Sequence, residues 1–312
     1  MTTTRRWPLV AALVIGLLLA AAPVAFQMFS RAPRGGDMID GFKPYMNVER
    51  IDRFRTDLST IDAAHAQAIA VVAPSPAVQR FLTEWPAIDD DMRSMLTTME
   101  HNIGNYRGVA ALPPFVLFPW FFVIPGLAVA VIAGFALRAE RKHRSGRGLR
   151  IALVAAGIGL IAAPAVFQMF TRAPGGASMI DDFKPFMTET KVTRIQGYFL
   201  TIGTAEGDLR RVVVPGLQAT GTPADQLDAI VSLNEQWPTI SAGMAPMIGA
   251  MADNVGNFGA VAALPPFGLF PWFFVVPGVL VIGLALGANR RSTATDPATE
   301  EQPALHLQGA PS

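Results

Sequence analysis

Charged residues are absent from four long stretches of the chain, and apolar residues dominate these stretches. The stretches lie between Arg6 and Arg31, Arg107 and Arg138, Arg150 and Arg172, and Asp253 and Arg290. A helix of about 20 apolar residues is long enough to cross a hydrocarbon core of roughly 30 Å. We therefore predict four transmembrane helices, at residues 7–29, 115–137, 149–170 and 267–288.

Small residues recur at every fourth position of these stretches, a spacing that lets membrane helices approach one another closely. Examples are Ala12, Gly16 and Ala20 in the first stretch and Gly126, Ala130 and Gly134 in the second. We expect the four helices to pack together as a bundle.

The two long segments between these stretches, 30–114 and 171–266, have a different pattern. Apolar residues recur there at steps of three and four, which is typical of one buried helix face. In the first segment one run extends from Ile39 to Ile61, and a turn around Ser75 follows. A second run starts after Trp85-Pro86, because proline suits the first turn of a helix. The pattern predicts a helical hairpin in each segment.

The two halves of the chain repeat one another. Residues 22–33 read APVAFQMFSRAP and residues 163–174 read APAVFQMFTRAP, an offset of 141 positions. Residues 111–126 and 263–278, ALPPFVLFPWFFVIPG and ALPPFGLFPWFFVVPG, match at an offset of 152, so the second copy has 11 extra residues in its middle. We infer a tandem internal duplication, with repeat 1 at 1–144, repeat 2 at 145–290 and a disordered cytoplasmic tail at 291–312. The expected fold is an all-α integral membrane protein whose two hairpins pack as a pseudo-twofold bundle.

The distribution of basic residues predicts the orientation. The connector 138–150 contains six basic residues and one acidic residue, Glu140. Cytoplasmic loops of membrane proteins carry an excess of Lys and Arg, so we expect this connector and both termini to be cytoplasmic. Segments 30–114 and 171–266 are then extracytoplasmic, and the expected location is the plasma membrane. The first stretch also has features of a cleaved signal peptide, but its repeat at 149–170 lies inside the chain, which favours retention.

Composition supports a membrane protein and excludes several kinds of chemistry. Hydrophobic residues make up 51% of the 312 residues, charged residues make up 16%, and the mean hydropathy is +0.35. A net charge of +1 gives no reason to expect nucleic acid as a partner. The chain has no cysteine, which excludes disulfides, thiol catalysis and thiolate metal sites.

Methionine provides the most specific chemical pattern outside the four stretches. All twelve methionines after Met1 occur at equivalent positions of the two copies. An M-x-x-M-x-x-x-M spacing places three thioethers on one helix face in each copy, and thioethers are soft ligands that suit Cu(I). The candidate metal ligands are Met92, Met95, Met99, Met244, Met247 and Met251. The favoured interpretation is core packing, because methionine is an adaptable filler and the same spacing marks a buried stripe.

No motif in the sequence identifies a reaction or a cofactor. A serine elbow, an HExxH zinc motif and a phosphate-binding loop are all missing. The plan of span, outer hairpin and span resembles half of a bacterial transmembrane receptor without its cytoplasmic signalling part, so nothing about function is carried over. We predict a non-catalytic membrane protein whose extracytoplasmic bundle binds, senses or scaffolds a partner. Besides the lipid bilayer, the expected partners are another membrane or extracytoplasmic protein, or further copies of this chain. The alternatives are a transport or lipid-handling membrane subunit and copper handling through methionine.

Overall fold

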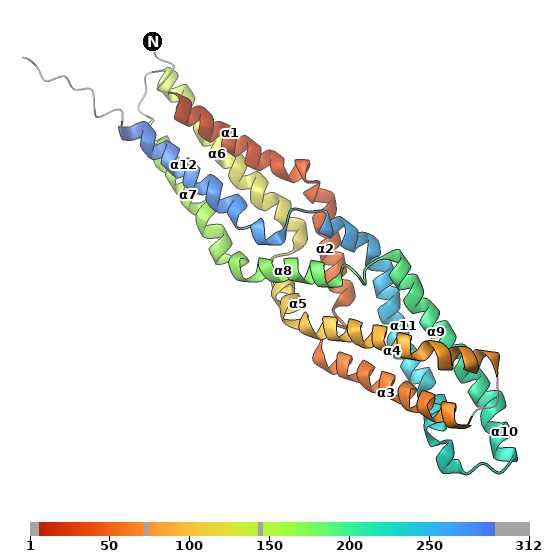
Figure 1. The fold of residues 1–312 in the computed structure, drawn as a ribbon. Coiled ribbons are helices and arrows are strands. Elements are labelled where there is room, and N and C mark those ends of the chain that lie inside the picture. Colours follow the sequence, from red (N-terminus) through yellow and green to blue (C-terminus); the bar gives the residue numbers. More distant parts are fainter. Residues whose placement is uncertain (1–5, 72–74, 143–145, 291–312) are drawn as a thin grey trace, which may run out of the picture. The chain divides into compact units, whose positions relative to one another are not determined.

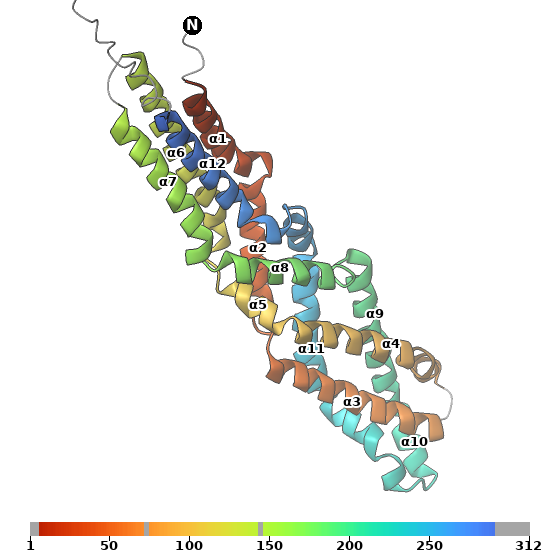
Figure 2. The same cartoon turned by 60° about the vertical axis from the view of Figure 1, so that its left-hand side comes forward.

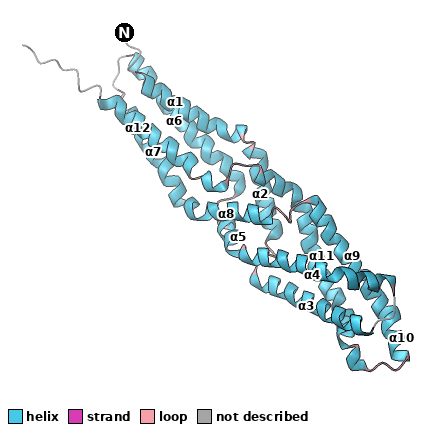
Figure 3. Cartoon of the chain, in the orientation of Figure 1, coloured by secondary structure: helices cyan, strands magenta, loops and turns pink. Residues whose placement is uncertain are grey.

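The computed structural model describes residues 6–71, 75–142 and 146–290, and every regular element among them is helical (Figure 3). The tail predicted at 291–312 lies outside the described residues. The α-helices, labelled in Figure 1, are α1 (Trp7–Ala25), α2 (Met28–Phe42), α3 (Val48–Val71), α4 (Pro76–His101), α5 (Ile103–Ala110), α6 (Phe118–Arg141), α7 (Arg147–Val166), α8 (Met169–Phe183), α9 (Glu189–Asp208), α10 (Val214–Ala219), α11 (Asp228–Ala262) and α12 (Trp272–Arg290). Short 3-10 turns precede α6 and α12, at Phe115–Leu117 and Phe267–Leu269.

The chain forms two compact units. One, which we call the span unit, is made of Met1–Ala20, Pro125–Ile161 and Val276–Ser312. The other, which we call the helical unit, is made of Ala21–Ile124 and Ala162–Val275. Each unit therefore combines segments from both copies of the repeated sequence.

Among the described residues, four helical stretches are long and apolar enough to cross a membrane, as the sequence predicts. They are Trp7–Ala25, Phe115–Arg141, Arg147–Val166 and Phe267–Gly287. Their outward side chains are apolar: Leu18 and Phe135, for example, are 65% and 58% exposed. Exposed side chains of this kind suit a hydrocarbon environment rather than water.

Within the span unit, glycines allow the helices to pair at very short range. A Cβ atom placed on Gly16 of α1 would lie 2.6 Å from the backbone nitrogen of Ala130 in α6, and one placed on Gly126 would lie 2.6 Å from that of Ala20. The pair α7 and α12 repeats this arrangement, because a Cβ on Gly278 would lie 2.8 Å from the carbonyl oxygen of Gly157. Both helix pairs thus approach backbone to backbone at equivalent positions of the two copies.

The first predicted span is too long at its C-terminal end. The sequence pattern predicts a helix to residue 29, but α1 ends at Ala25 and α2 begins at Met28. Gln27 between them has φ 54° and ψ 33°, a left-handed conformation that interrupts the helix. Gln168 has the same conformation between α7 and α8 (φ 53°, ψ 34°). The Gln27 carbonyl accepts hydrogen bonds from the Arg31 backbone N–H and from the Ser30 hydroxyl, each at 3.0 Å.

A four-helix bundle forms part of the helical unit. Helix α3 packs against α4, α4 against α9, α9 against α11, and α11 against α3, which closes the ring (Figures 1 and 2). The apolar stripe predicted for 30–114 faces the inside of this bundle, since Ile51, Phe54, Leu58 and Ile61 are at most 1% exposed. Two helices come from each copy. Each long segment also contains helices beyond the predicted hairpin, namely α2 and α5 in the first copy and α8 and α10 in the second.

The predicted start of the second helix at Pro86 is wrong. Helix α4 begins at Pro76 and continues through Pro86, and α11 likewise continues through Pro238. The start signal is Ser75 instead, whose side chain accepts a hydrogen bond from the Val78 backbone N–H. Pro76 occupies the first helical position after this cap, where a backbone N–H would have no partner within the helix, so its absence costs no helical hydrogen bond.

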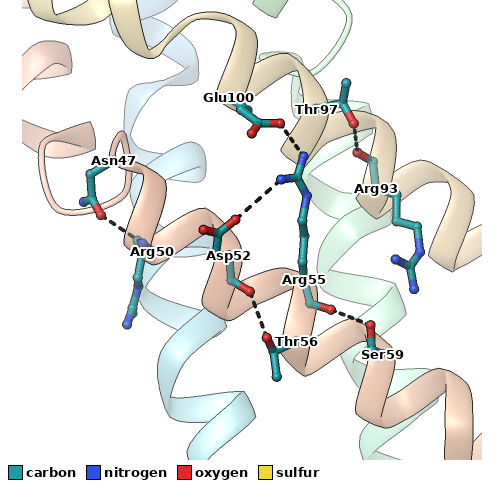
Figure 4. Close-up of polar contacts among 9 residues, drawn as sticks. All are labelled: Asn47, Arg50, Asp52, Arg55, Thr56, Ser59, Arg93, Thr97 and Glu100. Carbon is teal, nitrogen blue, oxygen red and sulfur yellow. Dashed lines mark hydrogen bonds and ion pairs between the residues drawn. The ribbon is translucent and has the colours of Figure 1, made fainter.

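An ion pair between Arg55 and Glu100 joins α3 to α4 (Figure 4). The Arg55 guanidinium lies 2.5 Å from the Glu100 carboxylate and also pairs with Asp52 at 3.6 Å. Arg55 lowers the pKa of the Glu100 carboxyl by donating a hydrogen bond and by its positive charge. Glu100 is exposed and Arg55 is partly exposed, so this pair adds little to the stability of the fold.

Candidate ligand-binding cavity

Eight methionine side chains converge on one cavity of about 50 Å³ inside the helical unit. They are Met38, Met46, Met95, Met99, Met179, Met187, Met247 and Met251. All remaining lining residues except Phe186 also occur in repeat-related pairs, for example Ile39 with Ile180 and Phe42 with Phe183. Equivalent residues of both copies therefore surround a single space.

Helical spacing explains why these side chains meet. Met95 and Met99 lie one turn apart on α4, and Met247 and Met251 lie one turn apart on α11, so each pair occupies one helix face. All four are at most 4% exposed. Helices α2 and α8 add Met38 and Met179, because α2 packs against α11 and α8 packs against α5.

The structure brings together four of the six methionines singled out in the sequence. Met95, Met99, Met247 and Met251 line the cavity, whereas Met92 and Met244 are buried in the surrounding core without lining it. The cavity methionines on α2, α8 and the turns after them were missed. The pairing of all methionines between the copies was the available signal for them.

The cavity lining has no charged side chain. Its one hydroxyl belongs to Tyr106, which donates a hydrogen bond to the Ile39 carbonyl oxygen at 2.7 Å. Burial, followed by the negative charge of Asp40, raises the pKa of Tyr106 to about 12. This hydroxyl is therefore neutral and already bonded, and the interior presents hydrocarbon, aromatic and thioether surface only.

A buried asparagine from the first copy forms a polar contact with the second. Asn102 is fully buried, and its side-chain amide donates to the Asp182 carboxylate at 2.9 Å and to the Thr98 carbonyl at 3.0 Å. Asn105 donates in turn to the Asn102 side-chain oxygen at 2.9 Å. Helix α4 ends just before Asn102, whereas α11 continues through the equivalent Asn254.

A second polar contact joins α4 to α9 across the four-helix bundle. The Asp91 carboxylate pairs with the Lys191 ammonium and accepts a hydrogen bond from the Tyr198 hydroxyl at 2.7 Å. Burial, together with the bond to Asp91, raises the pKa of Tyr198 to about 12. These contacts hold segments from different copies in one register.

A smaller cavity of about 20 Å³ lies next to the larger one. The two share Met38, Ile39, Met179 and Ile180 as lining residues, so these four side chains separate them. The rest of the smaller lining is apolar and includes Phe115, Phe118, Phe267 and Phe270. It also includes Gly35 and Gly176, which occupy equivalent positions on α2 and α8.

Other potential sites in the described residues have structural roles. His65 is 9% exposed, lies 3.1 Å from the Leu82 carbonyl and meets the Phe81 ring edge-on. Among the side chains that the structure describes, no group of three or more His, Cys, Asp or Glu residues could hold a metal ion.

No protein-family model matches this chain, and no curated protein matches its sequence.

Proposed function

We propose that this chain is a non-catalytic, multi-pass protein of the plasma membrane whose extracytoplasmic helical bundle binds, senses or scaffolds a partner. The observation that carries this proposal is the apolar cavity enclosed by equivalent residues of both copies. An apolar cavity inside a helical bundle is a common place for ligand recognition.

The proposed orientation rests on charge. Six basic residues in the connector 138–150 favour the cytoplasm for this segment and both termini. Segments 30–114 and 171–266 then lie outside the cell, where they can meet an extracytoplasmic or membrane partner.

We further propose that the two copies arose by tandem duplication and pack about a pseudo-twofold axis. Reciprocal contacts support this. The Arg31 guanidinium donates to the Ala263 carbonyl at 2.9 Å, and at the equivalent positions Arg172 donates to the Ala111 carbonyl at 2.8 Å. Each copy therefore supplies the arginine for the other copy's carbonyl, as expected from a twofold exchange.

Lipid handling is the second candidate function. The smaller cavity favours it, because part of its lining belongs to the candidate spans Phe115–Arg141 and Phe267–Gly287. Copper handling has less support, since a cavity without a carboxylate offers no countercharge for a buried cation.

The proposal is tested by crosslinking in native membranes, followed by purification in mild detergent and mass spectrometry of the bound protein and lipid. A protein partner in stoichiometric amount, crosslinked to 30–114 or 171–266, is the expected result. A homo-oligomer that carries only lipid would move lipid handling to first place, and one that carries copper would favour metal handling. A bare monomer would refute both binding and scaffolding.

A further inference from the structure

The two cavities of the helical unit form a row of apolar space. The larger, about 50 Å³, and the smaller, about 20 Å³, are separated only by side chains that they share. Met38 and Met179 are two of these four side chains. Thioether side chains rotate easily and adapt to irregular ligands, so this wall can open without movement of the backbone.

The lining selects hydrocarbon over a polar or charged group. No charged side chain lines either cavity, and the Tyr106 hydroxyl is already bonded to a backbone carbonyl. A lipid headgroup or a cation placed there would lose its hydration without gaining a partner.

The volumes favour a narrow, flexible ligand. A space of about 50 Å³ has room for roughly three to five groups of the size of a water molecule or a methylene. The smaller cavity adds room for one or two more, in line with the first. A linear chain fits such a row, whereas a fused ring system does not.

The smaller cavity also provides continuity with lipid. Phe115 and Phe267 in its lining are the first residues of two stretches that are apolar enough to span a membrane. Phe118 and Phe270, one turn further on, also line it. The apolar lining of the smaller cavity is therefore continuous along the chain with the start of two candidate spans.

We infer that the two cavities bind one acyl chain of a membrane lipid, which passes between the shared methionine and isoleucine side chains into the larger cavity. This inference rests on the proposed binding function of the helical unit and names the chemical class of one ligand. The shared methionine side chains rotate to admit the acyl chain. The aromatic side chains of the smaller cavity contact the part of the acyl chain that lies there.

The test uses the full chain reconstituted in phosphatidylcholine vesicles that contain some phosphatidylcholine with a diazirine near the end of one acyl chain. After irradiation, peptide mass spectrometry locates the attached lipid. We expect adducts on cavity residues such as Met38, Met179 and Ile180. Adducts confined to exposed side chains of the spans, such as Leu18 and Phe135, would overturn the inference.

A glycine variant closes the smaller cavity and has a matched control. A Cβ on Gly176 would lie 3.3 Å from Val109 and 3.7 Å from Phe267, so Gly176→Leu fills this space. Gly249 on α11 is exposed, and nothing lies within 4 Å of its Cβ position. Gly249→Leu therefore introduces the same side chain away from both cavities. We expect cavity adducts to fall by about tenfold in the first variant and to stay unchanged in the second. Equal yields in two folded variants would contradict the inference.

A volume-conserving variant separates hydrocarbon binding from thioether coordination. Met95→Leu combined with Met251→Leu removes two sulfurs and keeps the size of the side chains. Cavity adducts that persist in this variant support an acyl chain, and their loss would overturn it in favour of a sulfur-dependent ligand. If Gly176→Leu fails to fold by circular dichroism, Ile180→Phe in the shared wall replaces it, with the same expected loss.

The outcomes also separate this inference from the proposed function. A crosslinked protein partner without cavity adducts leaves the proposed function intact and removes the acyl chain. Cavity adducts without a protein partner support the inference and favour lipid handling.

Discussion

The closest helix contact in the span unit leads to a quantitative prediction for Gly126→Ala. A Cβ at this position would lie 2.6 Å from the Ala20 nitrogen and 2.7 Å from the Gly16 oxygen, both backbone atoms that no side-chain rotation can move. Helices α1 and α6 must therefore separate. Overpacking of this kind costs about 1–3 kcal/mol.

The matched control is Gly134→Ala, on the same helix, where a Cβ would meet nothing within 4 Å. Alanine stabilises a helix relative to glycine by roughly 1 kcal/mol at either position. This gain cancels in the comparison, so Gly126→Ala should be less stable than Gly134→Ala by about 1–3 kcal/mol.

The assay is equilibrium unfolding of the purified chain by SDS in mixed micelles, followed by tryptophan fluorescence. Adding Gly16→Ala to Gly126→Ala should cost less than its own single effect, because one separation relieves both clashes. Stabilities of Gly126→Ala and Gly134→Ala that agree within about 0.5 kcal/mol would refute the close pairing of α1 and α6.

Three further predictions concern the polar contacts of the helical unit. Tyr106→Phe should lower the free energy of unfolding by about 0.5–1.5 kcal/mol in chemical denaturation, because it removes one hydrogen bond. Phenylalanine is otherwise tolerated, since the second copy has Phe258 at the equivalent position. An unchanged free energy of unfolding would argue against the bond to Ile39. The pKa values of Tyr106 and Tyr198 are both raised to about 12, so their contribution to the free energy of unfolding should be fully present below about pH 10 and be lost as the pH rises towards 12. Ultraviolet titration of native and unfolded protein checks this. Ionisation of both groups near pH 10 in the native state would disprove it. Asn102→Leu should cost about 1–3 kcal/mol because it leaves the Asp182 carboxylate without its donor; unchanged thermal unfolding would show that water replaces the amide.

The four spans and the buried stripes could be predicted because they depend on patterns that extend over many residues. Each span is indicated by the absence of charge over 20 or more positions, and each buried stripe by apolar residues at steps of three and four. Both patterns combine the small structural preferences of many residues. Thus the stripe from Ile51 to Ile61 is buried as expected. Single-residue events were less predictable. The left-handed Gln27 ends α1 early, although glutamine has no strong preference for that conformation.

Prolines were misread for a similar local reason. Proline suits a helix start but can also occupy a helix interior when tertiary packing compensates for the lost hydrogen bond. Pro86 lies beside the buried Trp85, which packs against Phe81 one turn earlier. The helix therefore continues, and Ser75 and Pro76 mark its start.

The candidate cavity could be anticipated only in part. The sequence identifies methionine stripes on two helices, but not which stripes face each other. That depends on the packing of α2 against α11 and of α8 against α5, which joins residues more than 60 positions apart. The positions of Met38 and Met179 in the cavity lining could therefore be seen only in the tertiary structure.

The proposed binding function depends on which side of the membrane the segments 30–114 and 171–266 lie on. The lysines of the chain allow a direct test of this orientation without mutation. Lys43 and Lys184 are exposed in segments 30–114 and 171–266, and Lys142 is exposed in the connector. Intact cells are treated with a membrane-impermeant amine reagent, and labelled peptides are identified by mass spectrometry before and after permeabilisation. We expect labelling of Lys43 and Lys184 in intact cells and of Lys142 only after permeabilisation. Labelling of Lys142 in intact cells, with Lys43 and Lys184 protected, would place the helical unit in the cytoplasm and contradict the proposed extracytoplasmic binding.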